Sequence, residues 1–119
     1  MEQYTQLKPE SVFRYFSEIA AIPHGSENME AISAYCLNFA NEHALKAQRD
    51  DAGNVIIWKE GTAGYQDHAP VILQGHLDMV CQKTEDSSFD FTRDGLQLYV
   101  EDDFLKAVDT TLGQITEML

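Results

Sequence analysis

The sequence predicts an α/β fold, in which amphipathic helices pack on a β-sheet. Two segments with the helical spacing of apolar residues come first, and several short segments rich in β-branched and aromatic residues follow. The length of 119 residues corresponds to about one domain, and no repeat or interdomain linker interrupts it. We therefore expect one modest hydrophobic core.

Two helices are predicted in the first half of the chain. The first spans residues 9–21, because Pro9 is favourable at the first helical position and Pro23 disfavours helical geometry just before it. The second is expected to begin after Ser26, a good N-cap residue, and to run to His43. Each helix has one face that needs a partner surface. It consists of Val12, Phe13, Phe16, Ile19 and Ala20 in the first helix, and of Met29, Ile32, Cys36, Phe39, Ala40 and His43 in the second.

Short strands are expected to supply that surface. Residues 47–50 and 55–59 form a predicted hairpin, because turn-forming residues lie between them. Residues 71–75 form an uncharged, largely apolar run, typical of a strand buried on both faces. Two further strands are expected around residues 96–100 and 104–108, with Asp102 and Asp103 in the turn between them, and residues 82–94 are expected to form an irregular surface loop.

Charge and composition exclude several classes of function. The 20 acidic residues outnumber the 8 Lys and Arg, so the net charge is −12 at pH 7. This balance argues against nucleic-acid and anionic-membrane partners, which require clustered Lys and Arg. The longest aliphatic run, 71–73, is far shorter than the roughly 20 residues of a membrane helix, and the first residues lack a signal-peptide pattern. Two cysteines without CxxC spacing favour a reducing cytoplasm.

His76 and Asp78 are the strongest candidates for chemistry. They follow the predicted strand 71–75, and ligands of open α/β sheets bind beyond the carboxyl ends of strands. An imidazole at this place can bind zinc, and a carboxylate two residues on can orient it. A three-residue His-x-Asp pattern has little specificity, however, and both side chains can equally form hydrogen bonds to the following loop.

The remaining candidates are weaker. His24 fits a loop or capping role, and His43 can complement the negative end of the second helix. His68 lies in a glycine-containing loop, Cys36 lies in the apolar stripe, and Cys81 has no base nearby in the sequence. The sequence contains none of the common HExxH, GxSxG, GxGxxG or P-loop motifs.

Read together, several segments resemble the beginning of the M20 metallopeptidases, above all the aminoacyl-histidine dipeptidases. They agree in order and spacing from about residue 4 to Gly113. The segments that carry the resemblance are Ile22–Ser26, Asp51–Val55, Leu73–Val80, Asp90–Thr92, and the stretch from Lys106 to Gly113.

The resemblance implies a cytoplasmic hydrolase that uses two zinc ions to cleave dipeptides, including those that end in histidine. At the matching positions of the family, His76 would ligate one metal ion, and Asp78 would support that histidine and count as an active-site residue. The fold implied is the amino-terminal part of a zinc-peptidase catalytic domain, with helices on a mixed β-sheet. Such metal pairs polarise the peptide carbonyl and generate hydroxide near neutral pH.

The sequence departs from the family near its last residues. After Gly113 the family has Ala-Asp-Asn-Gly, and its metal-bridging aspartate falls here at Ile115, a side chain without donor atoms. Asp109 stands where many relatives have glycine. We therefore expect residues 1–119 to be a partial, truncated catalytic domain without the lid or dimerisation domain. We expect it to be inactive alone, to hold zinc weakly or not at all, and to expose apolar surface between residues 46 and 108 that favours homo-oligomers.

A single deleted base would explain this departure. Inserting one base before the codon of Gln114 lets the tail be read as Ala-Asp-Asn-Gly-Asn, so the family segment is recoverable in another frame. A deliberately chosen chain end is the alternative, but it would leave the altered residues after Gly113 unexplained. DNA sequencing across these codons decides between the two.

Two other functions are compatible with the sequence. The first is a small acidic binding or interaction domain that uses the same scaffold without metal. The second is a small working hydrolase that completes its site by oligomerisation. Adjacent DNA that encodes the rest of an M20 peptidase in another frame would exclude the first, and near-stoichiometric zinc would favour the second.

Overall fold

The computed structural model describes residues 3–110. The described residues form two compact units, one made of residues 3–32 and 78–110 and the other of residues 33–77. Among these residues, no helix combines the length and hydropathy needed to cross a bilayer. Helices and strands both form, so the α/β class predicted from the sequence is confirmed, although the described strands pair as two separate antiparallel hairpins.

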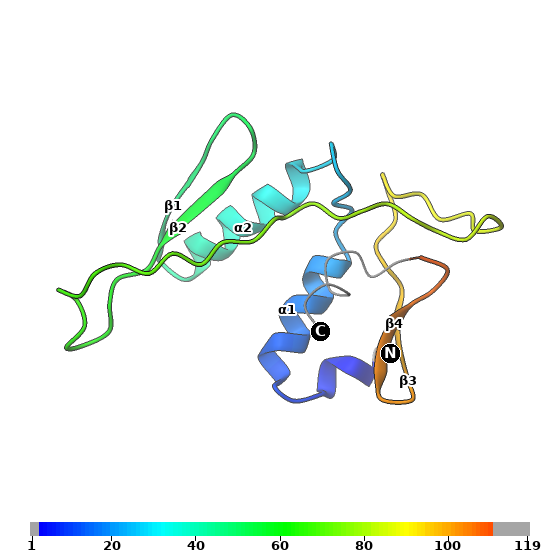
Figure 1. Ribbon diagram of the computed structural model, residues 1–119, viewed down its shortest axis with the longest axis horizontal. Coiled ribbons are helices and arrows are strands. Elements are labelled where there is room, and N and C mark those ends of the chain that lie inside the picture. The colour runs from blue at the N-terminus through cyan, green and yellow to red at the C-terminus, as the bar shows by residue number, and fades with distance from the viewer. Residues whose placement is uncertain (1–2, 111–119) are drawn as a thin grey trace. The chain divides into compact units, whose positions relative to one another are not determined.

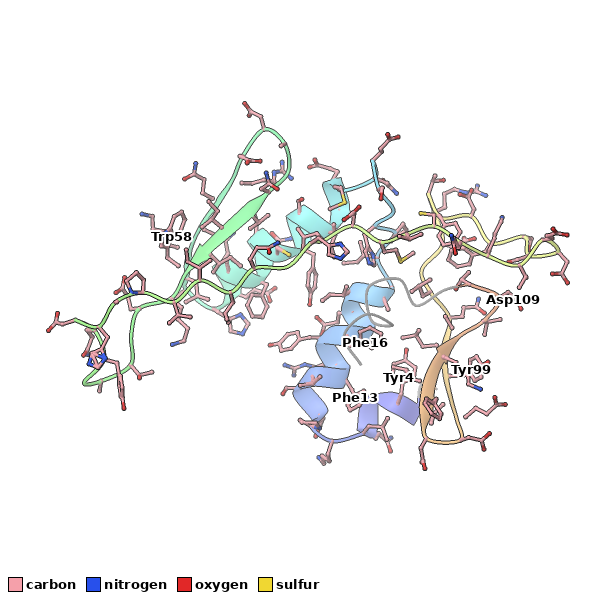
Figure 2. The ribbon with its side chains drawn as sticks, in the orientation of Figure 1. Tyr4, Phe13, Phe16, Trp58, Tyr99 and Asp109 are labelled. Carbon is pink, nitrogen blue, oxygen red and sulfur yellow. The ribbon has the colours of Figure 1, made fainter. Side chains whose placement is uncertain are left out.

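The first unit is built around helix α1 (Glu10–Ala20), the short 3-10 helix η1 (Gln3–Gln6) and a hairpin of β3 (Leu98–Glu101) and β4 (Phe104–Ala107) (Figure 1). Helix η1 contacts both α1 and β3. The aromatic side chains of Tyr4, Phe13, Phe16 and Tyr99 gather between α1, η1 and β3 (Figure 2). Tyr4 and Ala20 are buried, whereas Val12 and Ile19 of the predicted apolar face are exposed, so only part of that face contributes to the small core of this unit.

The β3–β4 hairpin confirms the turn predicted at Asp102 and Asp103. Both residues have positive φ angles, 51° and 63°, as the two central residues of a type I′ turn require. Glu101 pairs with Phe104 and Leu98 with Ala107 across the hairpin. Lys106 donates a hydrogen bond to the Glu101 carboxylate, and this bond raises the pKa of the Lys106 ammonium.

The second unit contains most of α2 (Glu30–Glu42) and the hairpin of β1 (Lys46–Arg49) and β2 (Val55–Trp58). Ser33 is fully buried, and its hydroxyl donates a 2.7 Å hydrogen bond to the carbonyl of Gly53 in the hairpin turn. The sequence pattern does not indicate that Ser33 is buried, because a single serine adds nothing to the periodicity of apolar residues. The hydroxyl fixes the turn against the helix because a buried polar group needs a partner.

Asp50 organises the β1–β2 turn. Its Oδ1 accepts hydrogen bonds from the backbone N–H groups of Ala52 and Asn54, and its Oδ2 accepts one from the Asn54 side chain. Gly53 adopts a φ of 88°, a conformation that glycine reaches without steric cost. The side-chain amide of Asn54, together with the surrounding backbone N–H groups, lowers the pKa of Asp50. The turn chemistry predicted for residues 51–54 is confirmed.

The strand predicted at residues 71–75 is wrong for the described chain. The segment follows an irregular course, and Val71, Ile72 and Leu73 are 84%, 87% and 93% exposed. A strand is held by hydrogen bonds to a neighbouring strand, and no hydrogen bond among the described residues reaches 71–75. The apolar composition shows that the segment is suited to burial. It does not show which strand would pair with it.

Helix α2 also begins later than predicted. Its first helical residue is Glu30, four positions beyond Ser26, so Ser26 is not its N-cap. Residues 25–28 form a turn instead, in which the Asn28 N–H donates to the Gly25 carbonyl and Glu27 has a φ of 71°. The hydroxyl of Ser26 donates a hydrogen bond to the Asp78 carboxylate instead.

Candidate functional site

His76 lies in the second unit, at the end of the exposed segment 71–75, and its side chain is exposed. Asp78 lies two positions along the chain, in the first unit, and is half-buried. An imidazole that reaches solvent and a carboxylate close by in the sequence are both donor types that zinc accepts. The predicted pair therefore has the right chemistry, and each member is accessible.

The residues around Asp78 are held by the loop that precedes α2. Gly25 and Met79 form a parallel β-bridge, in which the Met79 N–H donates to the His24 carbonyl at 3.0 Å and the Ser26 N–H donates to the Met79 carbonyl at 3.3 Å. Next to this bridge, the Ser26 hydroxyl donates a 2.7 Å hydrogen bond to Oδ2 of Asp78. Residues 24–26 thus form the structural support of the Asp78 segment.

His24 is part of this support rather than a metal ligand. Its side chain is buried, and Nδ1 lies 2.5 Å from the carbonyl oxygen of Ile22, to which it donates a hydrogen bond. The loop role predicted for His24 is therefore confirmed. Gly25 is buried as well, and a Cβ atom at this position would clash with Sγ of Cys81.

The other weak candidates are engaged in local structure. Nδ1 of His43 donates a 2.8 Å hydrogen bond to the Phe39 carbonyl at the end of α2, and the two rings stack. The same carbonyl also accepts the backbone N–H of His43 at 3.1 Å, so the imidazole adds a second hydrogen bond at the carboxyl end of the helix, in keeping with the predicted end-of-helix role. His68 packs edge-on against Tyr65. Burial raises the pKa of the Cys36 thiol, which disfavours the reactive thiolate.

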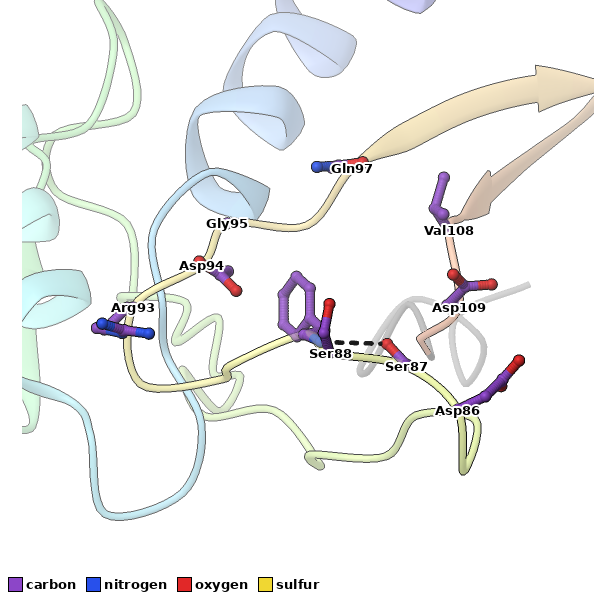
Figure 3. A pocket seen from close by; sticks show the side chains of 10 residues that line it. Asp86, Ser87, Ser88, Arg93, Asp94, Gly95, Gln97, Val108 and Asp109 are labelled. Carbon is purple, nitrogen blue, oxygen red and sulfur yellow. Dashed lines mark hydrogen bonds between the residues drawn. The ribbon is translucent and has the colours of Figure 1, made fainter.

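A cavity of about 490 Å³ lies elsewhere in the first unit (Figure 3). Its wall is mainly polar and includes Asp86, Ser87, Arg93, Asp94 and Asp109. The guanidinium of Arg93 is already paired with Asp90 at 2.8 Å, outside this set. Neither His76 nor Asp78 lines the cavity, so it is not the site predicted from the sequence.

The donor set for zinc is incomplete in the part of the chain that the structure describes. Within residues 3–110, no group of three or more His, Cys, Asp or Glu side chains is arranged to hold a metal ion. A closed zinc site requires three or four protein ligands. The chemistry of His76 and Asp78 fits zinc, but their number does not, and Ile115 lies outside the described residues together with the rest of the tail from Gln114.

Comparison with known proteins decides the relationship. No protein-family model matches the chain. The cytosol non-specific dipeptidase of Escherichia coli (strain K12) is 42% identical over 113 residues, which cover 95% of this chain and 23% of the relative. The crystal structure of the aminoacylhistidine dipeptidase from Vibrio alginolyticus matches with a TM-score of 0.89 and 39% identity, over 94% of this chain and 23% of that one.

The chain is homologous to a segment of these dipeptidases. The resemblance predicted from its motifs is thereby confirmed, and it extends to the fold. The chain spans about a quarter of the length of the two relatives.

Proposed function

We propose that this chain forms the amino-terminal part of the catalytic domain of a cytoplasmic, zinc-dependent dipeptidase of the M20 type, with Xaa-His dipeptides among its substrates. The observation that supports this most is the match over 94–95% of the chain, in sequence and in fold, to two proteins named as dipeptidases. The net charge of −12 argues against a nucleic-acid substrate.

In this proposal His76 is a zinc ligand and Asp78 is the active-site carboxylate that supports it. An exposed imidazole at the end of a segment can reach a metal ion, and a neighbouring carboxylate can fix its tautomer and raise its basicity. Zinc, when bound, would polarise the peptide carbonyl and lower the pKa of a bound water. The contribution of this chain is to place one ligand and its support, while other ligands come from residues outside the described part.

We infer further that the 119-residue chain does not turn over dipeptides by itself. The described residues hold no complete donor set, and Ile115 occupies the position at which the family has a metal-bridging aspartate. One imidazole with one carboxylate holds zinc weakly, because affinity comes from several ligands that close one geometry. We expect metal to be lost on simple dialysis.

The experiment that tests this function joins residues 1–113 to the part of the E. coli relative that follows the matched region. The hybrid is expected to hydrolyse Xaa-His dipeptides, and His76→Ala is expected to abolish turnover with loss of zinc. Asp78→Ala is expected to lower turnover about 10- to 100-fold with less metal lost, because it removes a supporting group rather than a ligand. His68→Ala, an exposed histidine of the same unit, serves as the matched control and should leave turnover unchanged.

Two outcomes would contradict the proposal. A folded hybrid whose activity does not change in His76→Ala would show that His76 is not a ligand. Robust hydrolysis by the purified 119-residue chain, lost in His76→Ala, would show that the chain completes a site by itself or through a second copy.

A further inference from the structure

We propose that Ser26 is a positioning residue that sets the orientation of the Asp78 carboxylate. This inference rests on the proposed function of Asp78 and gives a role to Ser26, which the proposed function does not include. Its basis is the 2.7 Å hydrogen bond from the Ser26 hydroxyl to Oδ2 of Asp78, which joins two segments 52 positions apart in the sequence.

The first argument is that the Ser26 hydroxyl does not cap the helix that follows it. Its sequence context predicts an N-cap, yet α2 begins only at Glu30. A serine before a helix ordinarily directs its hydroxyl at the backbone N–H groups of the first turn. Here the hydroxyl donates its hydrogen bond to the Asp78 carboxylate on the other side of the bridge instead. The loop therefore presents this donor to Asp78 rather than to the helix.

The second argument is that the backbone fixes the donor before the bond forms. Ser26 directly follows Gly25, which pairs with Met79, and Asp78 directly precedes Met79. Two backbone hydrogen bonds close this pairing, and His24, Gly25 and Met79 are buried around it. A solvent-exposed hydrogen bond is weak when it must immobilise both groups. In this arrangement the backbone has already immobilised them.

The third argument concerns the charge of the acceptor. A hydrogen bond to an ionised carboxylate is shorter and stronger than one between neutral groups. Oδ2 of Asp78 is fixed by Ser26, so rotation of the carboxylate about its side-chain bonds is restricted and the direction of the other oxygen is set. A carboxylate that orients a metal-bound imidazole must be held in this way, since its supporting bond is directional.

The first test measures the orientation of Asp78 by NMR on the 119-residue chain without metal. We expect the scalar couplings that report χ1 of Asp78 to indicate one rotamer in the wild type and in Ser26→Thr, which keeps the hydroxyl. Ser26→Ala should show averaging between rotamers. Ser11→Ala, an exposed serine on α1, is the matched control and should leave the couplings unchanged. A single Asp78 rotamer in Ser26→Ala would overturn the proposal.

The second test measures Zn²⁺ binding through the imidazole proton signals of His76 in the same variants. Ser26→Ala is expected to weaken apparent Zn²⁺ affinity about two- to fivefold, and Ser26→Thr should restore it. In an Asp78→Ala background, Ser26→Ala should have no further effect, because Ser26 acts through Asp78. An equal loss in both backgrounds would overturn the proposal. If His76 of the wild type does not respond to Zn²⁺, the 119-residue chain holds no zinc by itself, which the proposed function allows, and the χ1 comparison alone decides the role of Ser26.

Discussion

At the scale of single residues, the backbone conformation of Asp109 lowers the stability of the chain. Its φ of 56° lies in the left-handed region, where a side chain costs about 1–2 kcal/mol, although Asp tolerates it better than most residues. Glycine adopts this conformation without steric cost. We predict that Asp109→Gly raises the free energy of unfolding by about 0.5–1 kcal/mol, measured from the urea midpoint. Asp86→Gly, at an exposed position without positive φ, should lower it or leave it unchanged. A less stable Asp109→Gly variant would mean that the carboxylate stabilises the cavity it lines.

Asp50 should make the stability of the chain depend on pH. Hydrogen bonds from the Asn54 side chain and the nearby backbone lower its pKa below the usual 3.8, so folding favours the ionised form. Its contribution is therefore present above pH 3.8 and disappears as the pH falls through the lowered pKa. Asp50→Ala should melt below the wild type near pH 7, and the two melting curves should converge at acid pH. Asp51→Ala, the neighbouring exposed carboxylate, is the control and should follow the wild type at every pH. A constant difference from pH 7 to acid would contradict the account.

At the scale of single elements, the exposed segment 71–75 has the composition of an unprotected edge strand, although it forms no strand in the described chain. Residues 68–77 contain no Asp, Glu, Lys or Arg, so two copies can approach here without the repulsion that the net charge of −12 imposes elsewhere. The three aliphatic side chains are 84–93% exposed. Exposed, uncharged, apolar segments can form strands by pairing with other chains.

We predict that the chain self-associates through this segment at about 100 μM and above, as detected by light scattering coupled to size-exclusion chromatography. Ile72→Lys adds charge and Ile72→Pro removes a backbone donor, so both should shift the chain towards monomer without loss of helical signal. Val12→Lys, at an apolar position that is 59% exposed on α1, should not. A wild-type chain that stays monomeric throughout would refute the prediction. Association that survives Ile72→Pro but not Ile72→Lys would show apolar contact without strand pairing.

These elements also show what the sequence can predict. Local chemistry was sufficient for α1 and both hairpins, because Pro9, Asp50 and the pair Asp102–Asp103 act on their own neighbours. Only the exact start of α1 differs, since Pro9 is its N-cap in an extended conformation and the first helical residue is Glu10. It was insufficient for 71–75, because whether an apolar run becomes a strand depends on partners far away in the sequence. It also gave Ser26 the wrong role, since the competing acceptor, Asp78, lies 52 positions away.

At the scale of the whole molecule, His76 and Asp78 were predicted from a strand-end motif, and the resemblance gave them roles. The structure adds that His76 is exposed and that Asp78 is bonded to Ser26. The remaining zinc ligands could not be derived, because a metal site is assembled from segments distant in sequence and the described residues contain no complete set. The central claim is therefore that this chain supplies one zinc ligand to a dipeptidase site that other residues complete.

Zinc stoichiometry tests this claim most directly. Metal would be quantified by atomic emission after exhaustive dialysis of three proteins: the 119-residue chain, the hybrid with the remaining part of the E. coli relative, and the hybrid carrying His76→Ala. We predict almost no zinc in the 119-residue chain, about two ions per hybrid molecule, and clear loss of zinc in the His76→Ala hybrid. Near-stoichiometric zinc in the 119-residue chain, or a His76→Ala hybrid that keeps its full zinc content, would contradict the account.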